Sequence, residues 1–310
     1  MERSLVIAAP AQKRERDALT HAAWGQRLDL EQFARREERL RGHPWARDGM
    51  TTWLLVDGGG APLASCETFR MGASSCLGDG TGYGIASVFT EPRLRGQGHA
   101  QAMISLLAER LSAEDPLAQA AILFSEVGPT LYRRAGFREI PWLERSIPAA
   151  DAGEIPGLRL VSERALADAL AAIPRPPDPF LIWPTAGQLD WHLERERIYA
   201  GILARPRPHA VGAILGDAVA IWAGDLKNER LCVLVAHAPD AEAGAALLRA
   251  AGSIAAAAGL GSVHVWESAG FPLPPGLGTV REAEDVPMIR PLASGVDAGQ
   301  WRTVPRALWV

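Results

Sequence analysis

The chain has 310 residues, about twice the size of an ordinary domain, so its length predicts two domains. Hydrophobic residues make up 48% of it, which is enough for a sizeable core and excludes wholesale disorder. Its 32 basic residues face 36 acidic ones, and the resulting net charge of -4 does not favour nucleic acid as a partner.

Cysteine usage and the apolar runs narrow the class of protein. Three widely spaced cysteines match no metal or redox pattern, so we expect reduced thiols, no bound metal and a cytoplasmic location. The start of the chain carries Glu2 and too short an apolar run for a signal peptide. The longest apolar stretch, Ser253–Leu260, falls far short of the roughly 18 residues of a membrane helix, so we expect no membrane partner.

Helical and strand patterns alternate through the first half of the chain. Apolar residues recur at helical spacing after residue 98, and β-branched or apolar runs bounded by turn residues predict strands. In chain order we expect a strand at Leu5–Ala8, a helical stretch at Gln12–Gly42, strands at Thr51–Val56 and Pro62–Phe69 around a glycine-rich hairpin turn, a Gly/Ser-rich loop at Met71–Gly82, a strand at Gly84–Thr90, a helix at His99–Leu111, a strand at Ala121–Phe124, a short helix at Thr130–Ala135 and a strand from Phe137 onward.

A change of composition around residues 148–157, rich in Pro, Ala, Asp and Gly, predicts a domain boundary. We therefore expect domains at residues 1–150 and 151–310, the second repeating the element order of the first as a tandem α/β fold. The second half is expected to hold helices at Ala186–Leu203 and Ala241–Gly259 and strands at Ala210–Leu215, Ala218–Ala223, Leu231–Ala236, Ser262–Glu267 and Val286–Arg290.

The segment Val88–Ala100 carries the clearest chemical signal. A strand leads through a glycine-rich turn that contains arginine directly into a helix, whose first N–H groups are unpaired and carry a partial positive charge. Gly96 and Gly98 let the backbone approach a ligand closely, and this arrangement suits a pyrophosphate. It is neither a Walker loop, because no Gly-Lys-Ser/Thr follows, nor a dinucleotide fingerprint, because the third glycine is missing.

This segment resembles the acyl-CoA-binding motif of the GNAT family of N-acyltransferases. The family pattern is Gln/Arg-x-x-Gly-x-Gly/Ala, and Arg95, Gly98 and Ala100 fit it at the expected place after the fourth strand. Arg93, Gly96 and Gly98 fit it in a second register. The resemblance implies a donor site for acetyl-CoA as co-substrate.

A second segment, Phe124–Phe137, resembles the strand-to-helix unit that follows in the same family. There a tyrosine precedes Gly-Phe and often protonates the departing CoA thiolate, and Tyr132 occupies that place here. Ser125 stands where many members have asparagine. The alternative reading is an ordinary βα unit with turn glycines and a packing tyrosine.

Short blocks across the chain resemble the fungal lysine N6-acetyltransferases of lysine catabolism, which are two-lobed GNAT proteins. The resemblance implies an α/β tandem GNAT-like fold with a mixed central sheet flanked by helices in each lobe. Residues 1–150 would form the catalytic lobe, and residues 151–310 a degenerate lobe that closes the acceptor site. It further implies acetyl transfer to the side-chain amine of free lysine. The matching blocks are Cys66–Phe69, Val88–Thr90, Phe124–Pro129, Trp191–Glu196 and Ile221–Asp225.

Acyl transfer to an amine by direct attack requires positioning of the reactants and proton handling. We expect Tyr132 to act as general acid, and Glu67 or Glu126 as base or amine-orienting group, with a water held by Ser125 as an alternative base. Each of these residues also has a purely structural alternative. Tyr132 could be a packing residue, Glu67 a solvent-facing strand residue, and Glu126 a cap of the following helix. The expected donor-binding residues are Val88, Phe89, Thr90, Arg93, Arg95, Gly96, Gln97, Gly98, His99, Ala100 and Ser125, with the backbone of Phe89 polarising the carbonyl.

The second half lacks an equivalent phosphate loop. Its counterpart, Ala238–Gly244, has no arginine and no paired glycines, and its two carboxylates would repel phosphate at a helix N-terminus. We therefore expect this lobe not to bind CoA. A stripe of Trp191, Glu194, Arg195 and Ile198 at helical spacing is expected to be a packing and salt-bridge face.

The function predicted from the sequence is thus N-acetyl transfer to a small-molecule amine, by a monomer or homodimer. One alternative keeps the chemistry but takes a lysine or ornithine side chain in a peptide, or a longer acyl donor. Another, of a different class, is a non-catalytic acyl-CoA-binding sensor.

Overall fold

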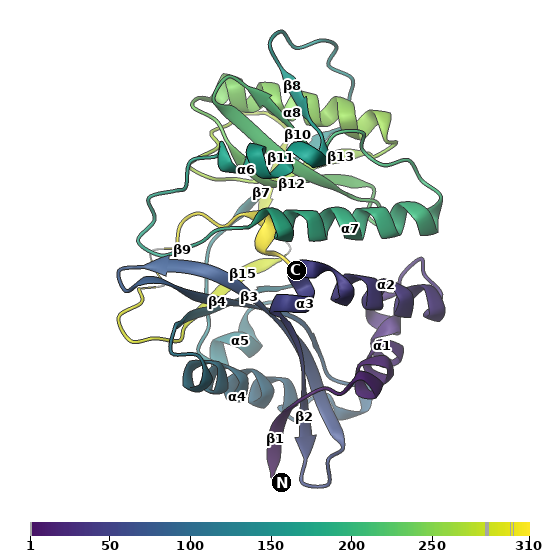
Figure 1. The fold of residues 1–310 in the computed structure, drawn as a ribbon, viewed down its shortest axis with the longest axis vertical. Helices are drawn as coiled ribbons and strands as arrows, with labels where there is room; N and C mark the ends of the chain where they lie inside the picture. The colour runs from purple at the N-terminus through teal and green to yellow at the C-terminus, as the bar shows by residue number, and fades with distance from the viewer. Residues whose placement is uncertain (1, 283–284, 298, 300) are drawn as a thin grey trace.

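The computed structural model describes residues 2–282, 285–297, 299 and 301–310. Two mixed sheets, each flanked by helices, lie one above the other in two lobes, and the C-terminus lies between them (Figure 1). The predicted α/β class with one mixed sheet per lobe is therefore confirmed. Within the described residues, no helix has the length and apolar character needed to cross a bilayer.

The first lobe is built on a sheet in the order β1-β2-β3-β4-β5-β15-β6, with β9 added beside β3. Its neighbouring strands are antiparallel, except for the parallel pair β4 and β5. The elements of this lobe are β1 (Arg3–Ile7), α1 (Pro10–Trp24), α2 (Leu30–Gly42), α3 (Pro44–Gly49), β2 (Met50–Asp57), β3 (Pro62–Ser75), β4 (Gly78–Phe89), a 3-10 turn (Pro92–Leu94), α4 (His99–Glu114), β5 (Ala118–Ser125), α5 (Thr130–Arg134), β6 (Arg138–Glu139), β9 (Leu181–Ile182) and β15 (Val286–Pro291).

The second lobe has a sheet in the order β14-β7-β13-β12-β11-β10-β8, with β12 and β13 as its parallel pair. The similar sheet pattern supports the predicted tandem arrangement. The elements of this lobe are β7 (Leu143–Pro148), β8 (Arg159–Val161), a 3-10 turn (Glu163–Ala165), α6 (Leu166–Ala171), α7 (Ala186–Leu203), β10 (Gly212–Leu215), β11 (Ala218–Asp225), β12 (Arg230–His237), α8 (Ala241–Ala257), β13 (Ser262–Trp266), β14 (Thr279–Glu282) and a 3-10 turn (Arg306–Leu308).

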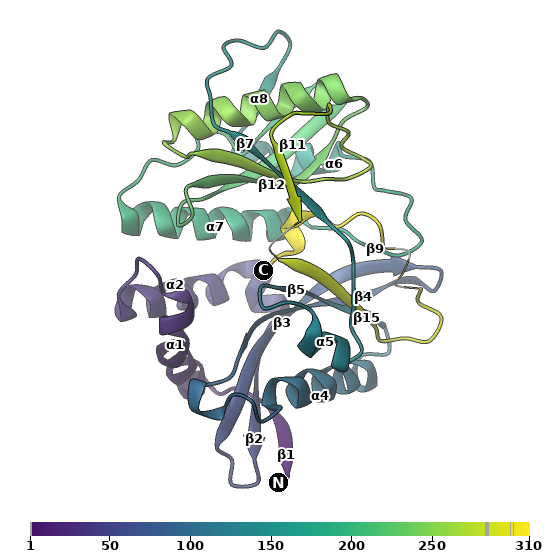
Figure 2. The same cartoon turned by 180° about the vertical axis from the view of Figure 1, so that it is seen from behind.

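The two lobes exchange strands (Figure 2). β7 leaves the first half of the chain to pair with β13, and β15 returns from the second half to pair with β5. The sheets therefore do not divide at residue 150, and the strand expected at Val286–Arg290 belongs to the first sheet rather than the second. By covering β5, β15 removes an edge that would otherwise expose unpaired backbone groups.

Two predictions of local structure are wrong. The helical stretch Gln12–Gly42 is interrupted, because Asp29 caps a new helix: its carboxylate accepts from the N–H of Gln32 at 2.7 Å, and the Gln32 side chain accepts from the N–H of Asp29 at 3.0 Å. The expected loop at Met71–Gly82 is instead the paired end of β3 and β4. Its glycines permit close packing, since a Cβ at Gly82 would lie 2.7 Å from the Ile182 side chain.

The parallel pair β4 and β5 separates at one end. Its pairing runs from Thr81 and Ala118 to Ile85 and Leu123, after which both strands continue apart. A bulge against β3 falls just beyond this point, at Ser87, whose φ is +51°. The backbone of β4 from residue 86 to 89 is thereby turned away from β5 and lines an opening in the sheet.

Met288 of β15 lies fully buried among side chains of the first-lobe core. We expect Met288→Ala to lower the free energy of unfolding by about 2–5 kcal/mol, because it leaves a cavity in that core. Urea unfolding measures this loss, with the exposed Leu117→Ala as a control expected to change stability by less than about 0.5 kcal/mol. Equal losses in the two variants would contradict the placement of β15 in the first core.

Candidate functional site

A cleft of about 1260 Å³ lies between the lobes and passes through the opening between β4 and β5. It runs from the N-terminus of α4 to α7 and the last residues of the chain. Arg93, Gln97 and Ser125 lie outside its lining. The predicted site residues that do line it are Glu67, Val88, Phe89, Thr90, Arg95, Gly96, Gly98, His99, Ala100, Glu126 and Tyr132.

The N-terminus of α4 offers unpaired backbone donors to one end of this cleft. Gly98 is the N-cap residue with φ +76°, no side chain caps the helix, and its first turn holds no acid. Gly96 is also left-handed, at φ +77°, and a Cβ at either glycine would meet no atom of a described residue within 4 Å. The result is an open cradle of N–H groups at the positive end of a helix dipole, which suits an anion such as a phosphate.

The side chains around this cradle differ in burial and in their hydrogen-bond partners. Arg95 donates from Nε to the carbonyl of Thr90 at 3.1 Å and so braces the turn. The His99 ring is buried and has no hydrogen-bond partner among the described residues, and burial lowers its pKa, so the ring is neutral at pH 7. Arg93 is exposed and paired with Glu91 at 2.9 Å. The backbone carbonyl of Gln97 accepts from the Arg3 guanidinium at 3.4 Å.

Tyr132 lies on the single turn of α5, on the other side of the sheet opening. Its ring meets Phe137 edge-on with centroids 6.3 Å apart, and only 7% of the residue is exposed. Burial, aided by Glu126 and Cys66, raises the pKa of Tyr132 to about 12. The phenol is therefore protonated at neutral pH and can donate a proton into the cleft.

Glu67, on β3, is held by a buried arginine from α1. Arg16 binds Glu67 Oε1 at 3.0 Å, the hydroxyl of Ser65 at 3.1 Å and the carbonyl of Ser87 at 3.0 Å. Burial raises the pKa of Glu67, while the Arg16 guanidinium opposes that rise. The same arginine thus fixes the carboxylate and the bulge of β4, and joins α1 to both.

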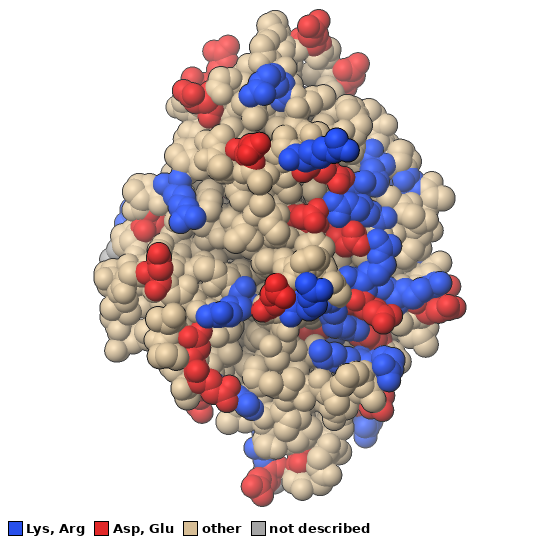
Figure 3. Space-filling model, in the orientation of Figure 1, with Lys and Arg blue, Asp and Glu red and all other residues tan. Residues whose placement is uncertain are grey.

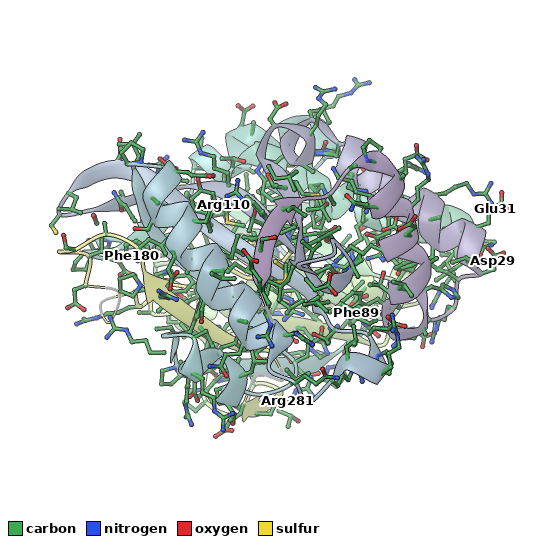
Figure 4. All side chains as sticks on the ribbon, turned by 90° about the horizontal axis from the view of Figure 1, so that it is seen from below. Asp29, Glu31, Phe89, Arg110, Phe180 and Arg281 are labelled. Atoms are coloured by element: carbon green, nitrogen blue, oxygen red, sulfur yellow. The ribbon has the colours of Figure 1, made fainter. Side chains whose placement is uncertain are left out.

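The remaining candidates differ in exposure. Glu126 is exposed at the rim of the cleft, just after β5. Ser125 is buried and donates to the carbonyl of Gly128 at 2.7 Å, which makes it part of the turn before α5. Phe89 lies in the interior beside α1, its ring edge-on to Trp24 at 5.8 Å (Figure 4).

Sequence reasoning missed several charged residues of the cleft. Arg16 and Arg41 belong to helices expected to be polar and charged, and nothing in their spacing marks them as buried. The stripe on α7 packs as expected at Trp191, which donates to the Leu40 carbonyl at 3.1 Å and also lines the cleft, and at Glu194, which pairs with Arg39. The prediction is wrong for Arg195, which lines the cleft and makes no ion pair with a described residue.

In the second lobe, the place that corresponds to the α4 cradle is closed. Asp240 caps α8 by accepting from the N–H of Ala243 at 2.8 Å, and Ala238 donates to the carbonyl of Gly270 at 3.0 Å. A Cβ at Gly244 would lie 2.4 Å from the carbonyl oxygen of Pro272, so this loop covers the start of the helix. A phosphate at this helix terminus would therefore meet the Asp240 carboxylate and the Pro272 carbonyl oxygen.

Comparison with known proteins identifies one matching family and several similar acetyltransferases. Residues 162–296 match the family described as LYC1 GNAT-like C-terminal domain. A lysine acetyltransferase of Yarrowia lipolytica is 24% identical to this chain, over 76% of each protein. A GCN5-related N-acetyltransferase of Kribbella flavida superposes with a TM-score of 0.57 at 18% identity, over 94% of this chain and 72% of that one.

A probable N-acyltransferase of Enterococcus faecalis superposes with a TM-score of 0.60 at 16% identity, over 94% of this chain and 73% of that one. The GNAT fold is thereby confirmed, as is the predicted resemblance to GNAT N-acyltransferases and to the fungal lysine acetyltransferases. The expected enzyme class, a GNAT N-acetyltransferase, is confirmed with it.

The Arg16–Glu67 pair generates a stability prediction. Arg16→Met leaves Glu67 buried without its closest partner and should lower the free energy of unfolding at pH 7 by about 3–5 kcal/mol. Because the pKa of Glu67 is already raised above 4.5 and rises further without Arg16, the folded variant favours the protonated acid, so the loss shrinks as the pH falls toward 4.5. Urea unfolding at pH 7 and pH 5 measures both losses.

The matched control is Arg14→Met, an exposed arginine of the same helix, which should behave like the unmodified protein. Adding Glu67→Gln to Arg16→Met should restore part of the stability at pH 7. An equal loss in the free energy of unfolding at both pH values would contradict the proposal that an unpaired, buried Glu67 carboxylate destabilises the variant.

Proposed function

We propose that this protein transfers the acetyl group of acetyl-CoA to the side-chain amine of free L-lysine. The observation that carries the proposal is the continuity of one cleft, which joins an anion cradle, a protonated tyrosine and a buried carboxylate. In this reaction the amine nitrogen forms a bond to the thioester carbonyl carbon, the carbon–sulfur bond breaks, and the amine loses a proton while the thiolate gains one. No covalent enzyme intermediate is needed.

The α4 cradle is suited to the pyrophosphate of CoA. The N–H groups of the first turn and the left-handed glycines leave room for phosphate oxygens, and a side chain at residue 98 would stand in that space. The separated strand ends of β4 and β5 offer backbone N–H and C=O groups to the amide-bearing arm of the same ligand. The bulge at Ser87 brings this backbone to the edge of the opening.

The proton balance assigns roles to Tyr132 and Glu67. Tyr132, with its pKa raised to about 12, holds the proton that the departing thiolate needs. Glu67 is positioned by Arg16 to accept a proton from the amine or to orient it, and its raised pKa makes it a stronger base than an ordinary carboxylate. Glu126, at the rim, is the second choice for this role.

Lysine is the leading acceptor for two reasons. The Yarrowia lipolytica relative, 24% identical to this chain, is named a lysine acetyltransferase. The cleft is also walled on its far side by the second lobe, through Trp191 and Trp309, which favours a small molecule over a polypeptide. A cytoplasmic location remains part of the proposal.

The first test measures thiol release from acetyl-CoA with L-lysine and a panel of other amines. We expect turnover with lysine, and a loss of about 10²–10⁴-fold in kcat for Tyr132→Phe with an unchanged KM for acetyl-CoA. Tyr83→Phe is the control, because that hydroxyl donates to Asp115 at 2.8 Å and lies outside the cleft lining. Binding of CoA without release on any amine would refute the proposal and favour a sensor.

The donor site is tested separately by Gly98→Ala. An L-residue at φ +76° is strained by about 1–2 kcal/mol, and its Cβ would occupy the open cradle. We expect calorimetry to show CoA binding weakened by about tenfold or more. Gly58→Ala, in an exposed hairpin turn without positive φ, should leave the affinity unchanged. Unaltered binding in Gly98→Ala would contradict the assignment of the cradle to the pyrophosphate.

A further inference from the structure

We propose that Arg195 and Lys227 of the second lobe bind the α-carboxylate of the acceptor, so that the enzyme selects a free amino acid over a polyamine or a lysine within a peptide. This inference rests on the proposed function and adds to it the residues that determine specificity. It follows from two cations that line the cleft and form no ion pair with a described residue.

Arg195 projects from α7 into the cleft. It is half-buried, its guanidinium carbon lies 4.8 Å from the ring centroid of Trp309, and it makes no ion pair or hydrogen bond with any described residue. Other arginines of this region are paired. Arg197, on the same helix, binds Glu163 at 2.8 Å, Asp190 at 2.6 Å and Glu194 at 3.1 Å.

Figure 3 shows the contrast at the surface, where acidic and basic side chains alternate over α2 and α7. Both acids adjacent in sequence to Arg195 are engaged elsewhere: Glu194 accepts from Arg39 and Arg197, and Glu196 pairs with Arg207 at 2.9 Å. Arg36, which lines the cleft from α2, forms an ion pair with Glu37 at 2.6 Å. Arg195 therefore forms no ion pair with a described residue: the Trp309 ring orients its guanidinium, and Asp225, an acid whose charge acts on it, is itself hydrogen-bonded to Arg230.

Lys227 lies in the turn between β11 and β12 and also lines the cleft. It is half-buried and has no ion pair with a described residue, because the neighbouring Asp225 is bound by Arg230 at 2.9 Å and by the Asn228 amide at 2.8 Å. Burial lowers the pKa of Lys227, and the charges of Arg195 and Arg36 lower it further. Both side chains line the same cleft, and the charge of Arg195 acts on Lys227.

Two half-buried like charges that face an open cleft are stabilised by an anion placed between them. The position of the two cations relative to the phosphate cradle indicates which anion this is. α7 lies above the first sheet beside α2 and α3, whereas α4, with the phosphate cradle, lies on the opposite side of that sheet (Figure 1). The cation pair is therefore on the acceptor side, where a carboxylate of the amine substrate would reach it.

A lysine carboxylate would gain charge-assisted hydrogen bonds from both side chains, while its side-chain amine extends toward Glu67 and the sheet opening. Amines without this carboxylate would leave both cations unsatisfied. The enzyme would thus select its acceptor by the carboxylate end of lysine, away from the reacting nitrogen.

The test compares three acceptors that share the reacting amine: L-lysine, L-lysinamide and 1,5-diaminopentane. The unmodified protein should favour lysine in kcat/KM by about 10–100-fold over the other two. Lys227→Met and Arg195→Gln should each raise the KM for lysine by about tenfold or more. The same variants should change kcat/KM for lysinamide and diaminopentane, and the KM for acetyl-CoA, by less than about twofold.

Arg164→Gln, an exposed arginine of the second lobe outside the cleft lining, is the matched control and should leave all values unchanged. Lys227→Arg should recover part of the lysine preference. Lys227 lies in a turn, so its variant tests the proposal even where Arg195→Gln fails to fold, and CoA binding by calorimetry verifies folding in each case.

Different failures have different meanings. Equal use of lysine and lysinamide by the unmodified protein would overturn this inference and leave the acetyltransferase proposal standing. A rise in the KM for acetyl-CoA in place of that for lysine would also overturn it, because the cations would then serve the donor. Absence of turnover with any of the amines would overturn the proposed function and this inference together.

Discussion

Strands β4 and β5 cannot both remain paired along their length and leave room for a ligand, and the site depends on where their pairing ends. They separate after Ile85 and Leu123, just before the bulge at Ser87. Backbone groups freed in this way need partners, and a ligand or water must supply them. The α4 cradle, Tyr132 and Glu67 all lie around this opening, so the divergence of two strands positions the chemistry.

The buried Arg16 guanidinium fixes the position of the groups around the opening between β4 and β5. Arg16 connects α1 to the Glu67 carboxylate and to the carbonyl of Ser87, so helix, carboxylate and bulge are fixed as one unit. The exchange of β7 and β15 ties the second lobe to the same sheet. Because neither sheet is complete without a strand from the other half, the wall that carries Arg195 and Lys227 is held in place relative to the reacting groups.

The sequence predicted those parts whose signals are local. The turn and helix at Val88–Ala100, the tyrosine on α5 and the absence of a phosphate loop in the second half could be predicted because backbone conformation, capping and charge are set by neighbouring residues. The return of β15 to the first sheet and the burial of Arg16 could not be predicted, since both depend on contacts between residues far apart in the chain. Arg195 was expected on a packing and salt-bridge face because of its helical spacing, and its place in the cleft lining could not be predicted because it depends on how α7 packs against the first lobe.

A crystal structure of the protein with bound CoA tests the central claim most directly. We expect the pyrophosphate to lie on the N–H groups of residues 96–101, the pantetheine arm to enter between β4 and β5, and the sulfur to end near the Tyr132 hydroxyl. We also expect no second CoA at the start of α8, where Asp240 and the loop at Pro272 cover the helix. A CoA molecule bound beside α8, or one that leaves the opening between β4 and β5 empty, would contradict this claim.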